Sequence, residues 1–266
     1  MSTLRSLQDS LGQIGRRGLR SSMGWSVSWW HVLRVGALIL VLALSPSTYD
    51  RANRAALARH MYLGTATILP WFALLSALAS AVLIRIVIVT AQSYGLSQYA
   101  LEMMVRVLVL ELIPLGAALF VALRVTVPSG AELIRMQARG ELIALQRAGI
   151  DPLRQELLPR VAAGVFGVLM LATVSCLIAC ALAYLGIYGF TIGAFAGFTR
   201  TLGHIFDLPV SMVFVLKTLF FSIAVALIPA GALLRGSGAS SELESLVRLF
   251  AAILVIEGFS LMSNYY

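Results

Sequence analysis

The stretch that decides the fold runs over residues 128–160 and reads PSGAELIRMQARGELIALQRAGIDPLRQELLPR. It is the most polar part of an otherwise apolar chain. Ser129 followed by Glu132 is a capping-box pattern, so we predict that a helix begins at about Gly130. Gly140 lowers the helix propensity of the middle of this segment and favours a kink there.

The end of this predicted helix is also marked in the sequence. Gly149 suits a left-handed turn that closes a helix, and Asp151 suits the N-cap of the next helix, with Pro152 at its first position. Apolar and charged side chains recur around the helix, which makes it amphipathic. The apolar members are Leu133, Ile134, Leu142 and Leu145, and the charged members are Arg135, Arg139, Glu141 and Arg147. The plainest interpretation is a solvated surface helix that joins two membrane spans.

The composition is that of an integral membrane protein. Of 266 residues, 59% are hydrophobic and 12% are charged, with a mean hydropathy of +0.90. Soluble domains carry about 25% charged residues. The apolar runs have the length of membrane helices, and strand-length alternation is missing, so we predict an all-α polytopic protein rather than a barrel. The net charge of +8 is best explained by arginine held on the cytoplasmic side, not by nucleic-acid binding.

Five transmembrane helices are predicted along the chain. They cover about residues 62–89, 102–127, 161–185, 210–234 and 243–263. Pro70 indicates a break in the first span, and Pro114 lies inside the second. Five glycines between residues 186 and 209 predict an irregular or re-entrant segment before the fourth span.

The N-terminal part has a different character. Residues 1–30 combine four arginines with Trp25, Trp29 and Trp30, which predicts an amphipathic helix in the membrane interface. The apolar run 32–44 is short for a span and contains Arg34, so we interpret it as in-plane or shallowly re-entrant; a sixth span is the competing interpretation. We therefore divide the chain into an N-terminal interfacial or elbow segment, 1–60, and a transmembrane domain, 61–266. We expect no removable signal peptide.

The distribution of arginine predicts the orientation. The 128–160 stretch holds five arginines, whereas the 91–100 loop has none and the 186–209 loop has only Arg200. By the positive-inside rule, the N-terminus and the 128–160 helix are cytoplasmic, and the C-terminus is on the other side.

No catalytic constellation is visible in the sequence. It has no phosphate-binding loop of the G-x-x-x-x-G-K-[ST] type and no G-x-S-x-G nucleophile elbow. His31, His60 and His204 lack metal-ligand spacing, and Cys176 with Cys180 is better explained by core packing. We therefore expect no enzyme activity, metal or cofactor.

Charges inside the predicted spans are the remaining functional candidates. Glu111, Lys217 and Glu257 fall at a similar depth in the second, fourth and fifth spans, roughly 9–13 Å from the outer ends at 1.5 Å per residue. Ionisable groups in lipid are costly, so we expect the three to face the interior as one polar layer, either pairing structurally or lining a substrate cavity. Arg85, Arg106 and Arg124 lie nearer the span ends and are interpreted as snorkelling anchors.

Four short stretches carry a resemblance to a known family: Glu111–Pro114 (ELIP), Ala131–Leu133 (AEL), Ala148–Arg154 (AGIDPLR) and Leu158–Arg160 (LPR). From about residue 60 to residue 264 the chain resembles the MlaE permeases, the membrane subunits of ABC transporters that move phospholipids between the membranes of Gram-negative bacteria. The family usually has an arginine where this chain has Leu110, and the glutamate of the family's Thr-Glu-Gln is displaced to Glu141. The chain looks like a divergent member.

The resemblance implies a permease subunit in the bacterial inner membrane that exchanges lipid with a periplasmic lipid-binding partner and supports outer-membrane lipid asymmetry. The implied partners are a separate ABC ATPase, a periplasmic MCE-type protein, a small cytoplasmic STAS-type subunit and a second copy of the chain; no nucleic acid is implied. Residues 130–149 become the coupling helix on the ATPase. The residues that carry coupling are then Glu132, Arg135, Arg139, Glu141, Leu142, Leu145, Asp151 and Arg154, and the polar lipid-cavity residues are Glu111, Lys217 and Glu257.

Two other functions stay open. One is an ion-coupled secondary transporter with the three buried charges as a proton relay, although we find no internal repeat and five spans do not divide evenly. The other is a non-transporting scaffold subunit of a lipid-transport complex.

Overall fold

The computed structural model describes residues 34, 36–42, 45, 51–96, 99–149, 151–231 and 239–265. All regular structure in these residues is helical, and five helices are long and apolar enough to cross a membrane. The prediction of an all-α polytopic membrane protein is therefore confirmed. The spans are Leu57–Ser93, Ala100–Ala138, Leu153–Tyr188, Leu208–Gly231 and Glu244–Ser263.

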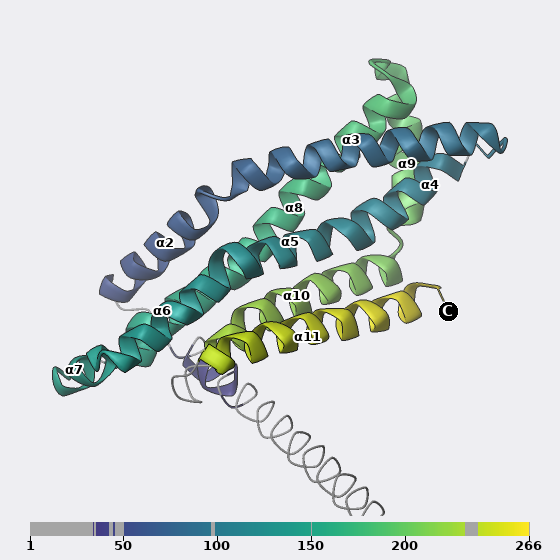
Figure 1. Cartoon of the computed structure of the whole chain (residues 1–266). Helices are drawn as coiled ribbons and strands as arrows, with labels where there is room; N and C mark the ends of the chain where they lie inside the picture. The colour runs from purple at the N-terminus through teal and green to yellow at the C-terminus, as the bar shows by residue number, and fades with distance from the viewer. Residues whose placement is uncertain are drawn as a thin grey trace, which may run out of the picture.

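The helices form an elongated bundle around α8 (Figure 1). Helix α8 packs against α2, α3 and α5, and on another side against α10, which in turn pairs with α11. The bounds are α2 Arg51–Ala66, α3 Leu69–Ser93, α4 Ala100–Met104, α5 Ile113–Val121, α6 Val127–Ala138, α7 Glu141–Arg147, α8 Leu158–Tyr188, α9 Phe195–Ile205, α10 Leu208–Gly231 and α11 Ala239–Tyr265. Three π-helical segments, η3 Val105–Leu112, η4 Ala122–Thr126 and η5 Leu153–Leu157, and a short 3₁₀ turn, η6 Ile192–Ala194, complete the chain order.

Small residues give α8 its central place. A Cβ atom added at Gly164 would lie 2.7 Å from Thr126 Cγ2 and 3.2 Å from Ala226 Cβ, so α8 contacts η4 and α10 at backbone distance. Such close approach is how helices associate in a membrane, where lipid is as apolar as the side chains. The predicted break near Pro70 lies where the helix is interrupted between α2 and α3.

The second span continues without a break into the predicted coupling helix. Helices α4, η3, α5, η4 and α6 follow one another directly, so the predicted helix start at about Gly130 is wrong. The Ser129 hydroxyl donates to the Val125 carbonyl one turn earlier, at 2.7 Å, instead of capping a new helix. Pro114 and Pro128 each follow a π-helical segment, whose altered hydrogen-bond register accommodates a residue without an N–H.

The segment between the third and fourth spans was predicted to be irregular or re-entrant. It is largely helical, so the irregular alternative is wrong. Helix α8 ends at Gly189, whose φ is 64°, and α9 then folds back against the bundle. Phe198 of α9 is buried, and its ring meets that of Tyr184 edge-on with centroids 5.2 Å apart. Aromatic packing therefore overrides the low helix propensity of the glycines.

The predicted interfacial helix over residues 1–30, and part of the 32–44 run, lie outside the described residues. Residues 36–42 are helical, and Ile39 is buried against Leu133, Leu157 and Ala230 at the α6 end of the bundle.

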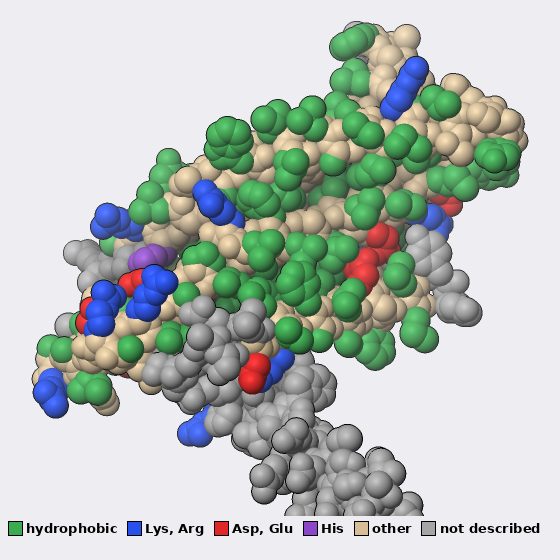
Figure 2. All heavy atoms as spheres, viewed as in Figure 1, with side chains coloured by type: hydrophobic (Ala, Val, Ile, Leu, Met, Phe, Trp, Pro, Cys, Tyr) green, Lys and Arg blue, Asp and Glu red, His purple; other side chains and the backbone are tan. Residues whose placement is uncertain are grey.

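The surface separates apolar and charged zones. Hydrophobic side chains cover the middle of the bundle, and arginine side chains gather at the α2 and α7 end (Figure 2). Exposed apolar residues such as Trp71, Leu177 and Phe259 are the ones a bilayer would cover.

Candidate functional site

Glu111, Lys217 and Glu257 meet inside the bundle, and we call them the charge triad. Lys217 Nζ on α10 forms an ion pair with Glu111 of η3 and lies 2.9 Å from Glu257 Oε2 of α11. It also donates to the Leu110 carbonyl at 3.3 Å. Three helices that are far apart in the sequence therefore supply one buried ionic contact.

The triad is unbalanced in charge. It combines one ammonium with two carboxylates, and the side chain of Lys217 is only 1% exposed. The Phe221 ring lies below the ammonium, with 5.8 Å from Nζ to the ring centroid. Buried ion pairs need near-complete satisfaction to offset desolvation, which explains why Lys217 contacts several acceptors.

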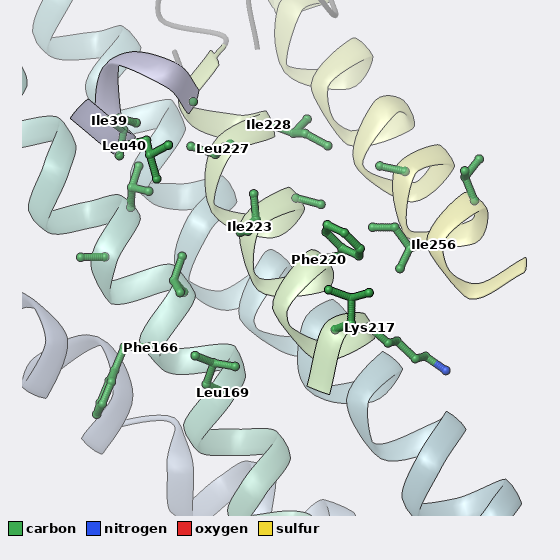
Figure 3. A pocket seen from close by; sticks show the side chains of 18 of the residues that line it. Ile39, Leu40, Phe166, Leu169, Lys217, Phe220, Ile223, Leu227, Ile228 and Ile256 are labelled. Carbon is green, nitrogen blue, oxygen red and sulfur yellow. The ribbon is translucent and has the colours of Figure 1, made fainter. Parts of the chain in front are cut away.

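A large apolar groove lies on another side of α10. Its volume is about 1370 Å³, and its walls come from α8, α10, α11 and the 36–42 helix. Phe166, Phe220 and Ile256 are among the side chains around it (Figure 3). The aliphatic part of Lys217 contributes to the wall, but its amino group points away from the groove (Figure 3). The groove and the ionised groups of the triad therefore face different spaces.

At the opposite end of the second span, α6 and α7 form what we call the coupling hairpin. Gly140 joins the two helices with a φ of 74°, a left-handed conformation that favours glycine. Arg139 bridges the turn: its Nη2 lies 3.0 Å from Glu132 Oε1, and its Nε lies 2.9 Å from Glu141 Oε1. Arg135 is more distant from Glu132, at 3.9 Å, and is largely exposed. These contacts link α6 and α7 across the turn.

The apolar side chains of α7 do not all face outward. Leu142 packs against the cluster that includes Leu133 and Leu157, and Leu145 is half-buried. Ile143 is the exposed large apolar residue of α7, at 56%. The sequence analysis did not single it out, because periodicity identifies apolar positions but not which of them the bundle covers.

The residues after the hairpin adopt the predicted capping geometry. Gly149 has a φ of 77°, and Asp151 Oδ1 accepts a hydrogen bond from the Leu153 amide at 3.0 Å. Arg154 Nε lies 3.4 Å from Asp151 Oδ2. Asp151 thus begins the helical segment that leads into α8.

Other polar candidates do not join these sites. Arg106 pairs with Glu102 at 3.0 Å near one end of its span, and Arg85 and Arg124 are exposed. Within the described ranges, no three His, Cys, Asp or Glu residues are grouped closely enough to hold a metal ion.

The Permease MlaE family matches residues 57–262, which is most of the sequence. The chain belongs to the MlaE permease family. No curated protein matches it. Membership of this family, together with the five apolar helices, makes the chain a multi-pass membrane permease of a lipid transporter. It is a transporter subunit rather than an enzyme, and its partners are in general those of an ABC transporter.

Proposed function

We propose that this MlaE-family chain is the permease subunit of an ABC transporter that moves phospholipid between the bacterial inner membrane and a periplasmic lipid-binding protein of the MCE type. ATP hydrolysis takes place on a separate ATPase subunit. The observation that carries the proposal is the coupling hairpin at the end of an unbroken helical second span, in a chain of this family. A small cytoplasmic STAS-type subunit is a further partner in the proposed complex.

The hairpin suits a groove on an ATPase. An amphipathic helix in a groove is held by its apolar anchors, and its charges set the register. Ile143 and Leu145 supply apolar surface that the bundle does not fully cover. Arg139 links α6 and α7 across the turn through Glu132 and Glu141. Because α6 continues the helical second span without a break, movement of the ATPase would pass to the span that carries Glu111.

A second copy of the chain completes the proposed transporter. The apolar groove of one copy is open on one side, whereas two copies facing each other would enclose a cavity. Closed twofold symmetry is the commonest arrangement of such assemblies. In this arrangement the charge triad contributes the polar part of the lipid path.

The docking proposal is tested with Ile143→Asp combined with Leu145→Asp in the full chain. Complexes purified in mild detergent are assayed for ATP hydrolysis and intact mass. We expect recovered ATPase activity to fall at least about tenfold, because a buried interface anchor contributes about 2 kcal/mol or more. The intact mass of the wild-type complex reports whether it holds two copies of the permease.

Phe190→Asp is the matched control. Phe190 is 93% exposed and follows the far end of α8, so this change introduces the same kind of charge without touching the hairpin. It should retain the ATPase. Full ATPase recovery with the hairpin variant would rule out docking at α7, and a single permease copy in an active complex would rule out the homodimer.

A further inference from the structure

The accessible side of the charge triad is acidic. The side chain of Lys217 is 1% exposed, whereas those of Glu111 and Glu257 remain 10% and 14% exposed. The ammonium is therefore hidden behind the carboxylates. A molecule that reaches the triad meets negative charge first.

The ammonium of Lys217 is already occupied. A lysine side chain has three N–H donors, and Glu111, Glu257 and the Leu110 carbonyl surround Nζ. This leaves Lys217 unsuited to bind a lipid phosphate. It acts instead as a positioning residue that holds the two carboxylates together.

One carboxylate charge of the triad remains unbalanced. Glu257 Oε2 lies 2.9 Å from Lys217 Nζ, but the same ammonium also pairs with Glu111. Ser260, three residues further along α11, is 6% exposed and lines the apolar groove. Its hydroxyl has no hydrogen-bond partner among the described residues. A buried carboxylate without a full counter-charge is costly, so a cation from outside the protein would be favoured here.

We propose that the charge triad selects lipids whose head group carries a primary ammonium. Such a head group brings a second positive charge to balance the surplus carboxylate, and N–H donors that a carboxylate can accept. A glycerol head group offers hydroxyls without positive charge. A choline head group offers positive charge without N–H donors. The proposal rests on the lipid-permease function proposed above and adds the head-group class.

The test measures which lipid the protein retains. The full chain is purified in mild detergent, stripped of lipid, and incubated with an equimolar mixture of phosphatidylethanolamine, phosphatidylglycerol and phosphatidylcholine that share the same acyl chains. Native mass spectrometry then counts each bound species. We expect the ethanolamine lipid to exceed the glycerol lipid about tenfold, the factor expected from one additional charge-assisted hydrogen bond.

Variants assign that preference to the triad. Glu257→Gln and, independently, Glu111→Gln should bring the ratio close to one. Glu102→Gln is the control, because Glu102 is an exposed carboxylate of the same span that pairs with Arg106.

Three results would overturn the proposal. Equal retention of the three lipids would mean that a proton, not a lipid ammonium, balances the second carboxylate. An ethanolamine preference that survives both glutamate changes would place selection elsewhere. Preferential retention of the anionic glycerol lipid would contradict an acidic site. Failure to retain any of the lipids is a different outcome, since it would remove the proposed lipid-permease function together with this inference.

Discussion

Lys217 is the residue on which the buried electrostatics depend, because its one ammonium serves two carboxylates from different helices. Counting along the predicted spans placed Glu111, Lys217 and Glu257 at one depth. It did not reveal that Lys217 would contact both carboxylates, since that depends on which faces of α10, α11 and η3 meet. Whether these groups serve lipid passage stays a prediction.

Removing the ammonium alone should cost more than removing the whole triad. Lys217→Met leaves two buried carboxylates together, and loss of one partner of a buried pair costs about 3–5 kcal/mol. Combining Lys217→Met with Glu111→Gln alone would still leave Glu257 without its partner. The triple variant with Glu257→Gln removes every charge and should be the more stable protein. Unfolding in mixed detergent, monitored by circular dichroism, compares the two; equal stability would mean that the three groups are not coupled.

At the scale of elements, the second span and the coupling hairpin form one mechanical unit. The capping-box pattern at Ser129 and Glu132 wrongly predicted a new helix start. This local pattern carries no information about the preceding π-helical turn, which allows the helix to continue through Pro128. The later signals were sound: Gly140, Gly149 and Asp151 all have the turn or capping geometry that their residue types favour. Residue types therefore predicted the turns and caps correctly, but they did not predict that the second span continues unbroken into α6.

Gly130 is where this unit meets α10. A Cβ atom at this position would lie 3.1 Å from the Pro229 carbonyl oxygen and 3.2 Å from Pro229 Cβ. Because a backbone oxygen in a helix end cannot move easily, Gly130→Ala should destabilise the protein by about 1–3 kcal/mol, as overpacking does. Gly258→Ala, with no atom within 4 Å of its added Cβ, should be neutral or slightly stabilising through helix propensity. Thermal unfolding in detergent measures both; equal effects would mean that the α6–α10 contact adapts freely.

For the whole molecule, apolar length was the reliable signal. Five long hydrophobic runs became five spanning helices, because a membrane protein must satisfy its backbone within each helix. The apolar groove on α8, α10 and α11 could not be predicted, because it depends on the angles and distances between these helices. Helix α9 was also not predicted from the sequence. Its glycines indicate low helix propensity, whereas the helix is stabilised by a ring contact between Tyr184 and Phe198 that the sequence does not reveal.

The charge asymmetry of the bundle predicts its orientation in the membrane. Arginines gather at the end formed by α2 and α7, so we expect that end to face the cytoplasm, with the C-terminus in the periplasm. Gln146 of α7 and Phe190 beyond α8 are both exposed and lie at opposite ends. With Cys176 and Cys180 changed to alanine, Gln146→Cys and Phe190→Cys provide one label site each. In right-side-out vesicles, a membrane-impermeant maleimide should modify Phe190→Cys, and Gln146→Cys should react only after lysis. The reverse pattern would mean that α7 lies on the periplasmic side, away from any cytoplasmic ATPase.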